Sequence, residues 1–199
     1  MPLANELQLA NMRDKVEAFA DITDAAWDAF SALMSPLSLS AGQYFLRNGE
    51  HARYLAFVVK GVLREFYITA QGSEFNKAFV LADGFTGSLY DLLSGQPSTV
   101  SIQALKESQL LVASFDEFQR LYDEHACWER TGRLLTQMLF MKKARREYEF
   151  LTLSAGERYE GLLQQYPDLE QQVPQYHIAS YLGITPVMLS RLRKGKPTG

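Results

Sequence analysis

The sequence predicts an α+β protein in which an antiparallel β-roll lies between helical segments. Residues 42–115 contain short runs of β-branched and aromatic residues that are separated by turn-forming glycines. Residues 127–151 continue a helical pattern without proline, and residues 175–194 fit two short helices joined at Gly183. These three observations predict strands in the middle of the chain and helices on both sides.

Length and composition limit the class of protein. The chain has 199 residues, of which 47% are hydrophobic, so it can bury one mid-sized domain and one small one. No apolar run approaches the ~20 residues of a membrane span, and the first ten residues lack the basic and apolar regions of a signal peptide. We therefore expect a soluble, cytoplasmic protein without a membrane partner.

Metal and cofactor chemistry is not expected. The single cysteine, Cys127, excludes an intrachain disulfide or a cysteine cluster, and we expect it to be a buried structural thiol. The three histidines, His51, His125 and His177, do not have the spacing of metal ligands. A cupin-like enzyme would also use a β-roll, but the strand region contains only His51. The sequence thus predicts neither an enzyme nor a cofactor.

The chain is expected to open with two helices between residues 11 and 34, the second capped by Thr23. The strand region follows. Its expected strands are YLAFVV (54–59), VLREFYI (62–68), EFNKAFV (74–80), VSIQAL (100–105) and QLLVAS (109–114). The expected turns are Asn48-Gly49, Lys60-Gly61, Gln71-Gly72, Asp83-Gly84 and Gly95-Gln96-Pro97.

Helical patterns return after the strands. Ser114 and Glu117 have capping-box spacing before a short helix, and a long helix is then expected over residues 127–151. Residues spaced alternately by four and three positions predict a coiled-coil seam against the same helix of a second copy of the chain. The seam is formed by Leu134, Met138, Met141, Arg145 and Tyr148. Leu135 and Leu139 form a second apolar line, so the helix could instead pack on the β-roll, or do both. The basic stretch KKARR (142–146) spreads around the helix and predicts no nucleic-acid surface.

The last 47 residues are expected to form a small helical unit. Ser154 and Glu157 make a second capping box, which opens a helix through Gln165, and residues 166–175 form a break. A helix-turn-helix unit starting at Gln175 has a small residue at its fifth position, Ala179, and a turn at its ninth, Gly183. Its inward apolar positions are Ile178, Leu182, Ile184, Leu189 and Leu192.

The second helix of this unit offers a surface for DNA. Thr185 supplies its N-cap and Pro186 its first turn, and Thr185 is also expected to contact DNA, with a cap alone as the alternative. With Leu189 and Leu192 inward, the exposed face comprises Pro186, Val187, Ser190, Arg191 and Lys194. We expect Arg191 to read a base edge, with a phosphate contact as the alternative, and Ser190 and Lys194 to contact phosphates. Charge supports this expectation, because residues 171–199 carry +4 without an acidic residue, whereas residues 1–170 carry −7.

The order of these elements resembles the Crp/Fnr family of bacterial transcription regulators. The resemblance covers residues 16–194, and its most specific pieces are YLAFVVKGVLREFY, GSLYDLLSGQPSTVSIQAL and VPQYHIASYLGITPVMLSRLRK. It implies a cyclic-nucleotide-binding-like β-roll sensor domain (1–122), a long dimerisation helix (123–152) and a winged-helix-like helix-turn-helix DNA-binding domain (153–199). It also implies a homodimer on a pseudo-palindromic site in double-stranded DNA, with RNA polymerase as a further partner.

The resemblance assigns the ligand site to a phosphate cassette, Gly-Glu followed ten residues later by Arg-Ser/Thr-Ala. Here the glycine is Gly87 and the hydroxyl residue is Thr99, whereas Ser88, Ser98 and Val100 stand at the glutamate, arginine and alanine positions. Leu89 and Tyr90 belong to the same segment. Without the arginine no full positive charge offsets a buried phosphate, so we expect weak or no cAMP binding. The β-roll then either binds an unidentified small effector or serves as a scaffold.

Other departures from the family matter as well. The cysteines that hold an iron-sulfur centre in its oxygen-sensing branch are missing, and heme has no evident ligand. A glutamate that often lies second after the capping residue is replaced by Val187, which could contact a thymine methyl group. The alternative function is a ligand-sensing or scaffold dimer that docks another protein without specific DNA binding.

Overall fold

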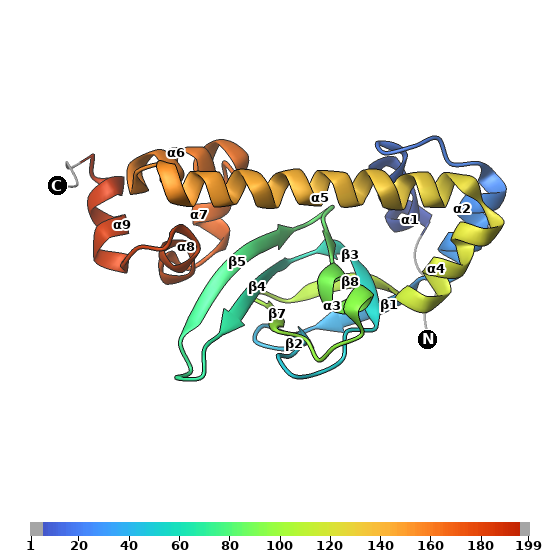
Figure 1. The fold of residues 1–199 in the computed structure, drawn as a ribbon, viewed down its shortest axis with the longest axis horizontal. Coiled ribbons are helices and arrows are strands. Elements are labelled where there is room, and N and C mark those ends of the chain that lie inside the picture. The colour runs from blue at the N-terminus through green and yellow to red at the C-terminus, as the bar shows by residue number, and fades with distance from the viewer. Residues whose placement is uncertain (1–5, 196–199) are drawn as a thin grey trace.

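The computed structural model describes residues 6–195 and places a β-roll beneath one long helix, α5 (Figure 1). The helices are α1 (Glu6–Glu17), α2 (Asp24–Ser31), α3 (Leu89–Ser94), α4 (Phe115–Glu124), α5 (Ala126–Thr152), α6 (Ala155–Gln165), α7 (Leu169–Gln172), α8 (Gln175–Leu182) and α9 (Pro186–Arg193). The strands are β1 (Ser35–Leu39), β2 (Tyr44–Leu46), β3 (Tyr54–Lys60), β4 (Val62–Ile68), β5 (Glu74–Leu81), β6 (Phe85–Thr86), β7 (Val100–Ala104) and β8 (Ser108–Ser114).

The β-roll consists of two four-stranded antiparallel sheets. Their strand orders are β1-β8-β3-β6 and β2-β7-β4-β5. Alternate side chains of both sheets point inward and form one apolar core, whose fully buried members include Val58, Leu63, Ile102 and Leu110. The predicted α+β class and the antiparallel roll are therefore confirmed, and all five predicted strands are present.

The structure also contains elements that the sequence pattern did not predict. Strand β1 (SPLSL) contains a proline and small polar residues, which do not predict a strand. It adopts the extended conformation because it pairs with β8 at the edge of the sheet. Strands β2 and β6 and helices α3 and α7 are too short for a periodic pattern. One predicted turn is corrected: at Asp83-Gly84 the positive φ, 64°, belongs to Asp83. An aspartate tolerates this conformation better than most residues do.

One end of α5 is anchored by aromatic packing. Trp128 is fully buried and donates a hydrogen bond to the carbonyl of Ala26 at 3.2 Å, and its ring centroid lies 4.5 Å from that of Phe30 of α2, with the ring planes tilted by 43°. The predicted N-cap of α2 is present, since Thr23 Oγ1 accepts a hydrogen bond from the Ala26 amide. Cys127 is half-buried beside this cluster rather than fully buried. The leading helices thus fix where α5 starts relative to the β-roll.

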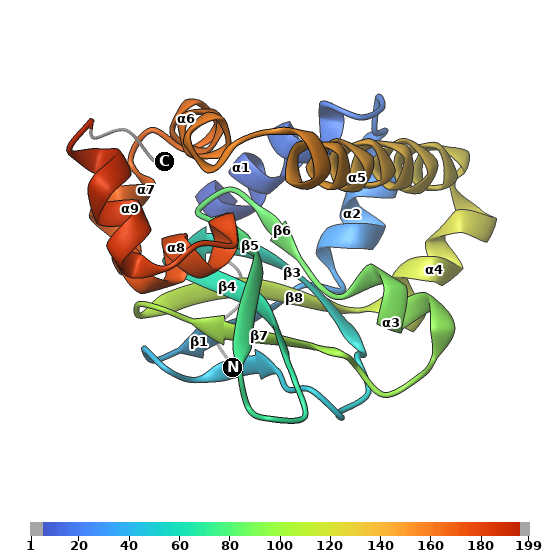
Figure 2. The ribbon, with the colours of Figure 1, turned by 60° about the vertical axis from the view of Figure 1, so that its left-hand side comes forward.

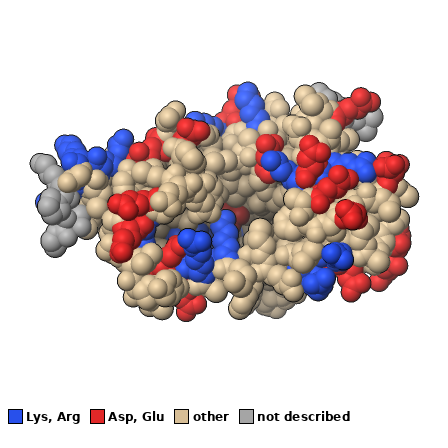
Figure 3. All heavy atoms as spheres, turned by 90° about the horizontal axis from the view of Figure 1, so that it is seen from above, with Lys and Arg blue, Asp and Glu red and all other residues tan. Residues whose placement is uncertain are grey.

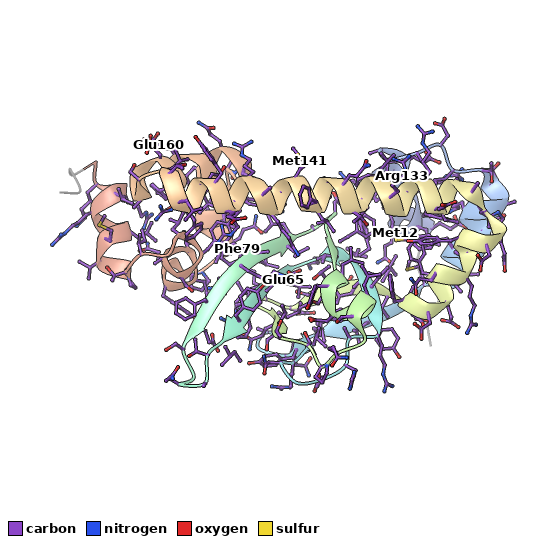
Figure 4. All side chains as sticks on the ribbon, in the orientation of Figure 1. Met12, Glu65, Phe79, Arg133, Met141 and Glu160 are labelled. Carbon is purple, nitrogen blue, oxygen red and sulfur yellow. The ribbon has the colours of Figure 1, made fainter. Side chains whose placement is uncertain are left out.

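Helices α6–α9 lie at the other end of α5, and α8 packs on strand β5 (Figure 2). The predicted capping box of Ser154 and Glu157 opens α6. Val62 and Phe79 of the β-roll belong to the same buried cluster as Ile178 and Leu189, and Figure 4 shows Phe79 on β5. The core of residues 153–195 is therefore continuous with the outer side of the β-roll at Val62 and Phe79.

The predicted winged-helix-like unit is corrected in one respect. Every regular element between residues 153 and 195 is a helix, so this part of the chain contains no β-wing. The segment has no run of alternating apolar and polar residues that could form a hairpin, and Pro167 and Pro174 separate its helices.

In the described residues, no helix combines the length and the apolar composition of a membrane span.

Candidate functional site

The turn between α8 and α9 has the local geometry that the sequence predicts. Gly183 ends α8 with φ 68°, in the left-handed region, and a Cβ atom there would lie 2.9 Å from the Phe150 ring of α5. Both conformation and space therefore require glycine. Thr185 Oγ1 accepts a hydrogen bond from the Met188 amide at 3.2 Å, and Pro186 is the first residue of α9. Thr185 is thus engaged as a cap.

The inward side of the pair α8–α9 is well packed. Ile178, Ala179, Leu182 and Leu189 are fully buried. Ile184 and Leu192 are half-buried against the same cluster. The tight packing of α8 against α9 fixes which side of α9 faces outward.

The outward side of α9 collects the five side chains predicted to face DNA. Pro186, Val187, Ser190, Arg191 and Lys194 line one shallow pocket on the protein surface. Lys and Arg side chains gather at this end of the molecule (Figure 3). This face combines an apolar portion, from Pro186 and Val187, with two cationic side chains.

The other basic residues of the C-terminal segment are placed differently. Arg193 Nε lies 3.0 Å from Glu170 Oε1, so its charge is paired within the chain. Lys196 lies outside the described residues. The unpaired basic charge on α9 thus belongs to Arg191 and Lys194, for which no ion pair occurs among residues 6–195.

Helix α5 presents an exposed apolar stripe. Phe140 is 69% exposed, Met141 66% and Leu151 78%. The stripe overlaps the predicted seam at Met141 and Tyr148; its apolar part follows steps of three and four residues at Met141, Ala144, Tyr148 and Leu151, with the polar Gln137 one step before it and Phe140 beside it. The remaining members of the predicted seam are Leu134, which is half-buried, Met138, which is 44% exposed, and Arg145, which pairs with Glu149.

The cassette region is built around a buried carboxylate. Asp91, in the first turn of α3, is 1% exposed, and its Oδ2 accepts a hydrogen bond from Ser98 Oγ at 2.6 Å. Asp91 Oδ1 is buried without a hydrogen-bond partner. Ser98 Oγ also accepts from the Val100 amide at 3.1 Å. Ser98, which the sequence predicts at the arginine position of the cassette, is thus bonded to an acid.

The structure brings together only part of the predicted cassette. Ser88, Ser98 and Val100 are buried; Gly87 has φ 141°, and a Cβ atom there would lie 3.1 Å from the Leu55 side chain and 3.2 Å from the Tyr54 carbonyl. Tyr90 is largely exposed, Leu89 is half-buried and Thr99 is exposed, so Tyr90 and Thr99 do not line the buried region. The sequence reading missed Asp91, although a lone carboxylate in the apolar run LYDLL is the signal of a buried polar group.

A second carboxylate lies on the inner side of the β-roll. Glu65 of β4 is almost fully buried and accepts a hydrogen bond from Thr86 Oγ1 at 2.8 Å, while Lys77 Nζ lies 3.1 Å from its other oxygen (Figure 4). Thr86 directly precedes the cassette glycine, Gly87. The polar groups of this part of the roll therefore bond to one another.

Residues 36–125 match the family model of the cyclic nucleotide-binding domain. The match covers the β-roll from β1 to the end of α4 and includes the whole cassette. A search of curated proteins returns no match to this chain.

Solved structures extend the similarity to most of the chain. FixK2 from Bradyrhizobium japonicum superposes with a TM-score of 0.69 at 18% identity, over 81% of this chain and 83% of its own. A putative cAMP-binding regulatory protein from Silicibacter pomeroyi gives 0.68 at 21% identity, over 96% and 88%. The c-di-GMP-responsive global regulator CLP of Xanthomonas campestris gives 0.65 at 16% identity, over 87% and 91%. At these identities the likeness establishes a fold shared with Crp/Fnr regulators.

Proposed function

We propose that the chain is a DNA-binding transcription regulator of Crp/Fnr type that acts as a homodimer. One observation carries the proposal: Pro186, Val187, Ser190, Arg191 and Lys194 share the exposed face of α9, while the opposite face is anchored through Leu189. A short helix that is fixed on one side and cationic on the other can enter the major groove of DNA. The guanidinium of Arg191 can donate two hydrogen bonds to guanine, and Lys194 can neutralise a phosphate.

The exposed stripe of α5 supports the dimer. A row of apolar side chains along a 27-residue helix is costly to leave in water, and its steps of four and three residues suit a second copy of the same helix. Two copies joined there would present two α9 helices to two half-sites of a palindromic DNA.

The basic stretch KKARR (142–146) of α5 is spread around the helix and does not form a second DNA-binding surface beside α9. Its Arg146 is engaged within the chain, since it donates to the Tyr181 carbonyl at 2.8 Å and lies over the Tyr181 ring.

An effector other than cAMP remains part of the proposal. The cassette has Ser88 and Ser98 at the two positions that would bind ribose and phosphate, and the carboxylate of Asp91 is bonded to Ser98. A cyclic phosphate would meet a buried negative charge instead of a guanidinium. Any small molecule that binds this roll must therefore use different chemistry.

The test is a selection of bound duplexes from a random DNA pool, run on the full chain with and without a metabolite extract. We expect enrichment of a two-fold symmetric motif by the wild-type protein and no enrichment by Arg191→Glu. Enrichment that depends on the extract would indicate an effector. A wild-type protein that enriches no motif under either condition would contradict the proposal.

The second candidate is a dimer that docks another protein through the same face, and the apolar pair Pro186 and Val187 favours it. Binding to duplex DNA at increasing salt separates the two candidates, because a phosphate-binding face holds the duplex with a steep salt dependence, whereas a protein-docking face need not bind DNA. Arg191→Glu in the full chain is the suitable comparison. Truncation at Leu169 is unsuitable, since it would expose Val62 and Phe79 of the shared core.

A further inference from the structure

A buried polar cluster joins the β-roll to the pair α8–α9. Arg64 of β4 is 5% exposed, and its guanidinium points at α8 from the outer face of the sheet. Arg64 Nη1 lies 3.3 Å from His177 Nδ1, and Asn76 Nδ2 lies 3.2 Å from the same nitrogen. Three buried polar residues, two from strands and one from α8, thus meet at one point.

The contacts of Arg64 and Asn76 determine the state of His177. Arginine can only donate hydrogen bonds, and the Asn76 amide nitrogen also donates to the His177 carbonyl at 3.1 Å. His177 Nδ1 must therefore be the acceptor, which leaves the ring neutral with its proton on Nε2. With this assignment, both hydrogens of the Asn76 side-chain amide have an acceptor, and the Arg64 guanidinium gains an acceptor on α8.

A third connection extends the cluster along α8. The backbone amide of Asn76 donates a hydrogen bond to Ser180 Oγ at 3.0 Å. Ser180 Oγ in turn donates to the backbone carbonyl of Glu74 at 3.2 Å. Strand β5 therefore bonds to two successive turns of α8. Such paired hydrogen bonds fix both the position and the rotation of α8 on the sheet. The surrounding apolar contacts of Val62 and Phe79 are not directional and do not fix them.

The cluster is built so that it can separate. Arg64 keeps two strong partners on its own side, because Glu74 Oε2 lies 2.6 Å from Nη1 and Gln103 Oε1 accepts from Nε and Nη2 at 2.9 and 2.7 Å. If α8 moved away, the Arg64 charge would stay paired and would regain water. Interfaces with this polar content resemble reversible contacts between domains more than they resemble cores.

We propose that Arg64, Asn76 and His177 form an interdomain latch that fixes the orientation of α8–α9 on the β-roll and thereby preorganises the two α9 helices of a dimer for a two-half-site DNA. The proposal rests on the DNA-binding function proposed above. Binding both half-sites requires both α9 helices in one relative orientation, whereas a single half-site requires only one helix. Opening the latch therefore weakens two-site binding, because the orientation must be restored at the moment of binding.

The direct test is hydrogen–deuterium exchange on the full chain, with Asn76→Ala and Arg64→Met as latch variants. Asn48→Ala is the matched control, since Asn48 Nδ2 also makes an inter-segment bond, to the Thr99 carbonyl, but does not contact α8. We expect amides of α8 and α9 to exchange about tenfold faster in both latch variants, with strands β3 and β8 unchanged. Exchange in α8 that matches the control would overturn the latch, whether or not the chain binds DNA.

The second test measures affinity for the selected two-half-site duplex and for one half-site alone. We expect Asn76→Ala to weaken the two-site complex about tenfold and to leave the half-site complex within twofold. An unchanged or tighter two-site complex would overturn preorganisation. Failure of the wild-type chain to bind any DNA would instead contradict the proposed function, while the exchange experiment would still decide whether the latch exists. If Arg64→Met does not fold, Asn76→Ala and His177→Asn carry both measurements.

Discussion

Ser98 Oγ donates a hydrogen bond to Asp91 Oδ2 at 2.6 Å, and both residues are almost completely buried. Their bond joins the first turn of α3 to the segment that precedes β7. The second carboxylate oxygen, Asp91 Oδ1, has no hydrogen-bond partner in the described chain.

The first prediction concerns cAMP. A cyclic phosphate in this cassette would lose its water and meet the Asp91 carboxylate without a guanidinium to offset the two charges. Titration calorimetry of the full chain with cAMP should therefore give no heat that fits a low-micromolar site. A saturable site of low-micromolar affinity at ordinary salt would show that other groups compensate the charge.

The second prediction concerns stability. Ser98→Ala removes the one hydrogen bond of the buried Asp91 carboxylate, and we expect the free energy of unfolding to fall by about 1–3 kcal/mol. Thr99→Ala changes the exposed neighbouring residue and should alter it by less than about 0.5 kcal/mol. Urea denaturation measures both. Equal effects of the two substitutions would mean that Asp91 is satisfied without Ser98.

The third prediction uses the pKa of His177, which burial and the nearby Arg64 charge lower to about 4, against an opposing effect of Glu74. Above about pH 7 the ring is mainly neutral in both the folded and the unfolded chain, so it adds little pH dependence. Between pH 6.5 and about 4 only the unfolded chain takes up the proton, and folding loses up to roughly 1.4 kcal/mol per pH unit.

The variant His177→Asn keeps an acceptor oxygen but does not titrate in this range. The difference in unfolding free energy between wild type and this variant should therefore change as the pH falls from 6.5 to about 4, and should be constant from pH 7 to 8. The difference removes the contribution of the carboxylates, which both proteins share. A difference that does not vary with pH would show that His177 takes up its proton in the folded chain as readily as in water.

The elements that the sequence predicted are those whose signals are local. Thr185 and Pro186 mark the start of α9, and Gly183 marks the end of α8, because caps and left-handed turns depend on a few adjacent residues. Strands β3, β4 and β5 were predicted for the same reason, since β-branched and aromatic runs bounded by turns extend over seven or eight residues.

The features that escaped prediction depend on contacts between distant segments. Strand β1 exists because it pairs with β8, about 70 residues later in the chain. Arg64 and Glu65 read only as two charges in an apolar strand, and their partners, His177 and Thr86, come from other parts of the sequence. The same limit explains the seam of α5: spacing alone allows several registers, and only the packing of the folded chain leaves Gln137, Met141 and Ala144 in water.

The fourth prediction concerns the dimer. Met141→Glu places a charge in the middle of the exposed stripe of α5, where a twin helix would bury it without a partner. We expect light scattering after size-exclusion chromatography to show the wild type as a dimer and this variant as a monomer at the same micromolar concentration. Lys143→Glu, on another side of α5, is the control and should remain dimeric. A wild-type monomer would contradict the dimer, and a dimeric Met141→Glu would place the subunit contact elsewhere.

The fifth prediction separates base reading from phosphate binding on α9. Arg191→Ala should weaken binding to the selected site by about 1–3 kcal/mol and relax the preference at one base pair, because a bidentate contact to guanine is lost. Lys194→Ala should weaken binding to all sequences alike and reduce the salt dependence by about one phosphate contact. Fluorescence anisotropy with the selected duplex, its single-base variants and an unrelated duplex measures both effects. Arg193→Ala is the comparison, since Glu170 already pairs its charge, and it should cost least. If Arg191→Ala weakened every duplex equally, Arg191 would be a phosphate contact, and base reading would have to come from Val187 and Ser190.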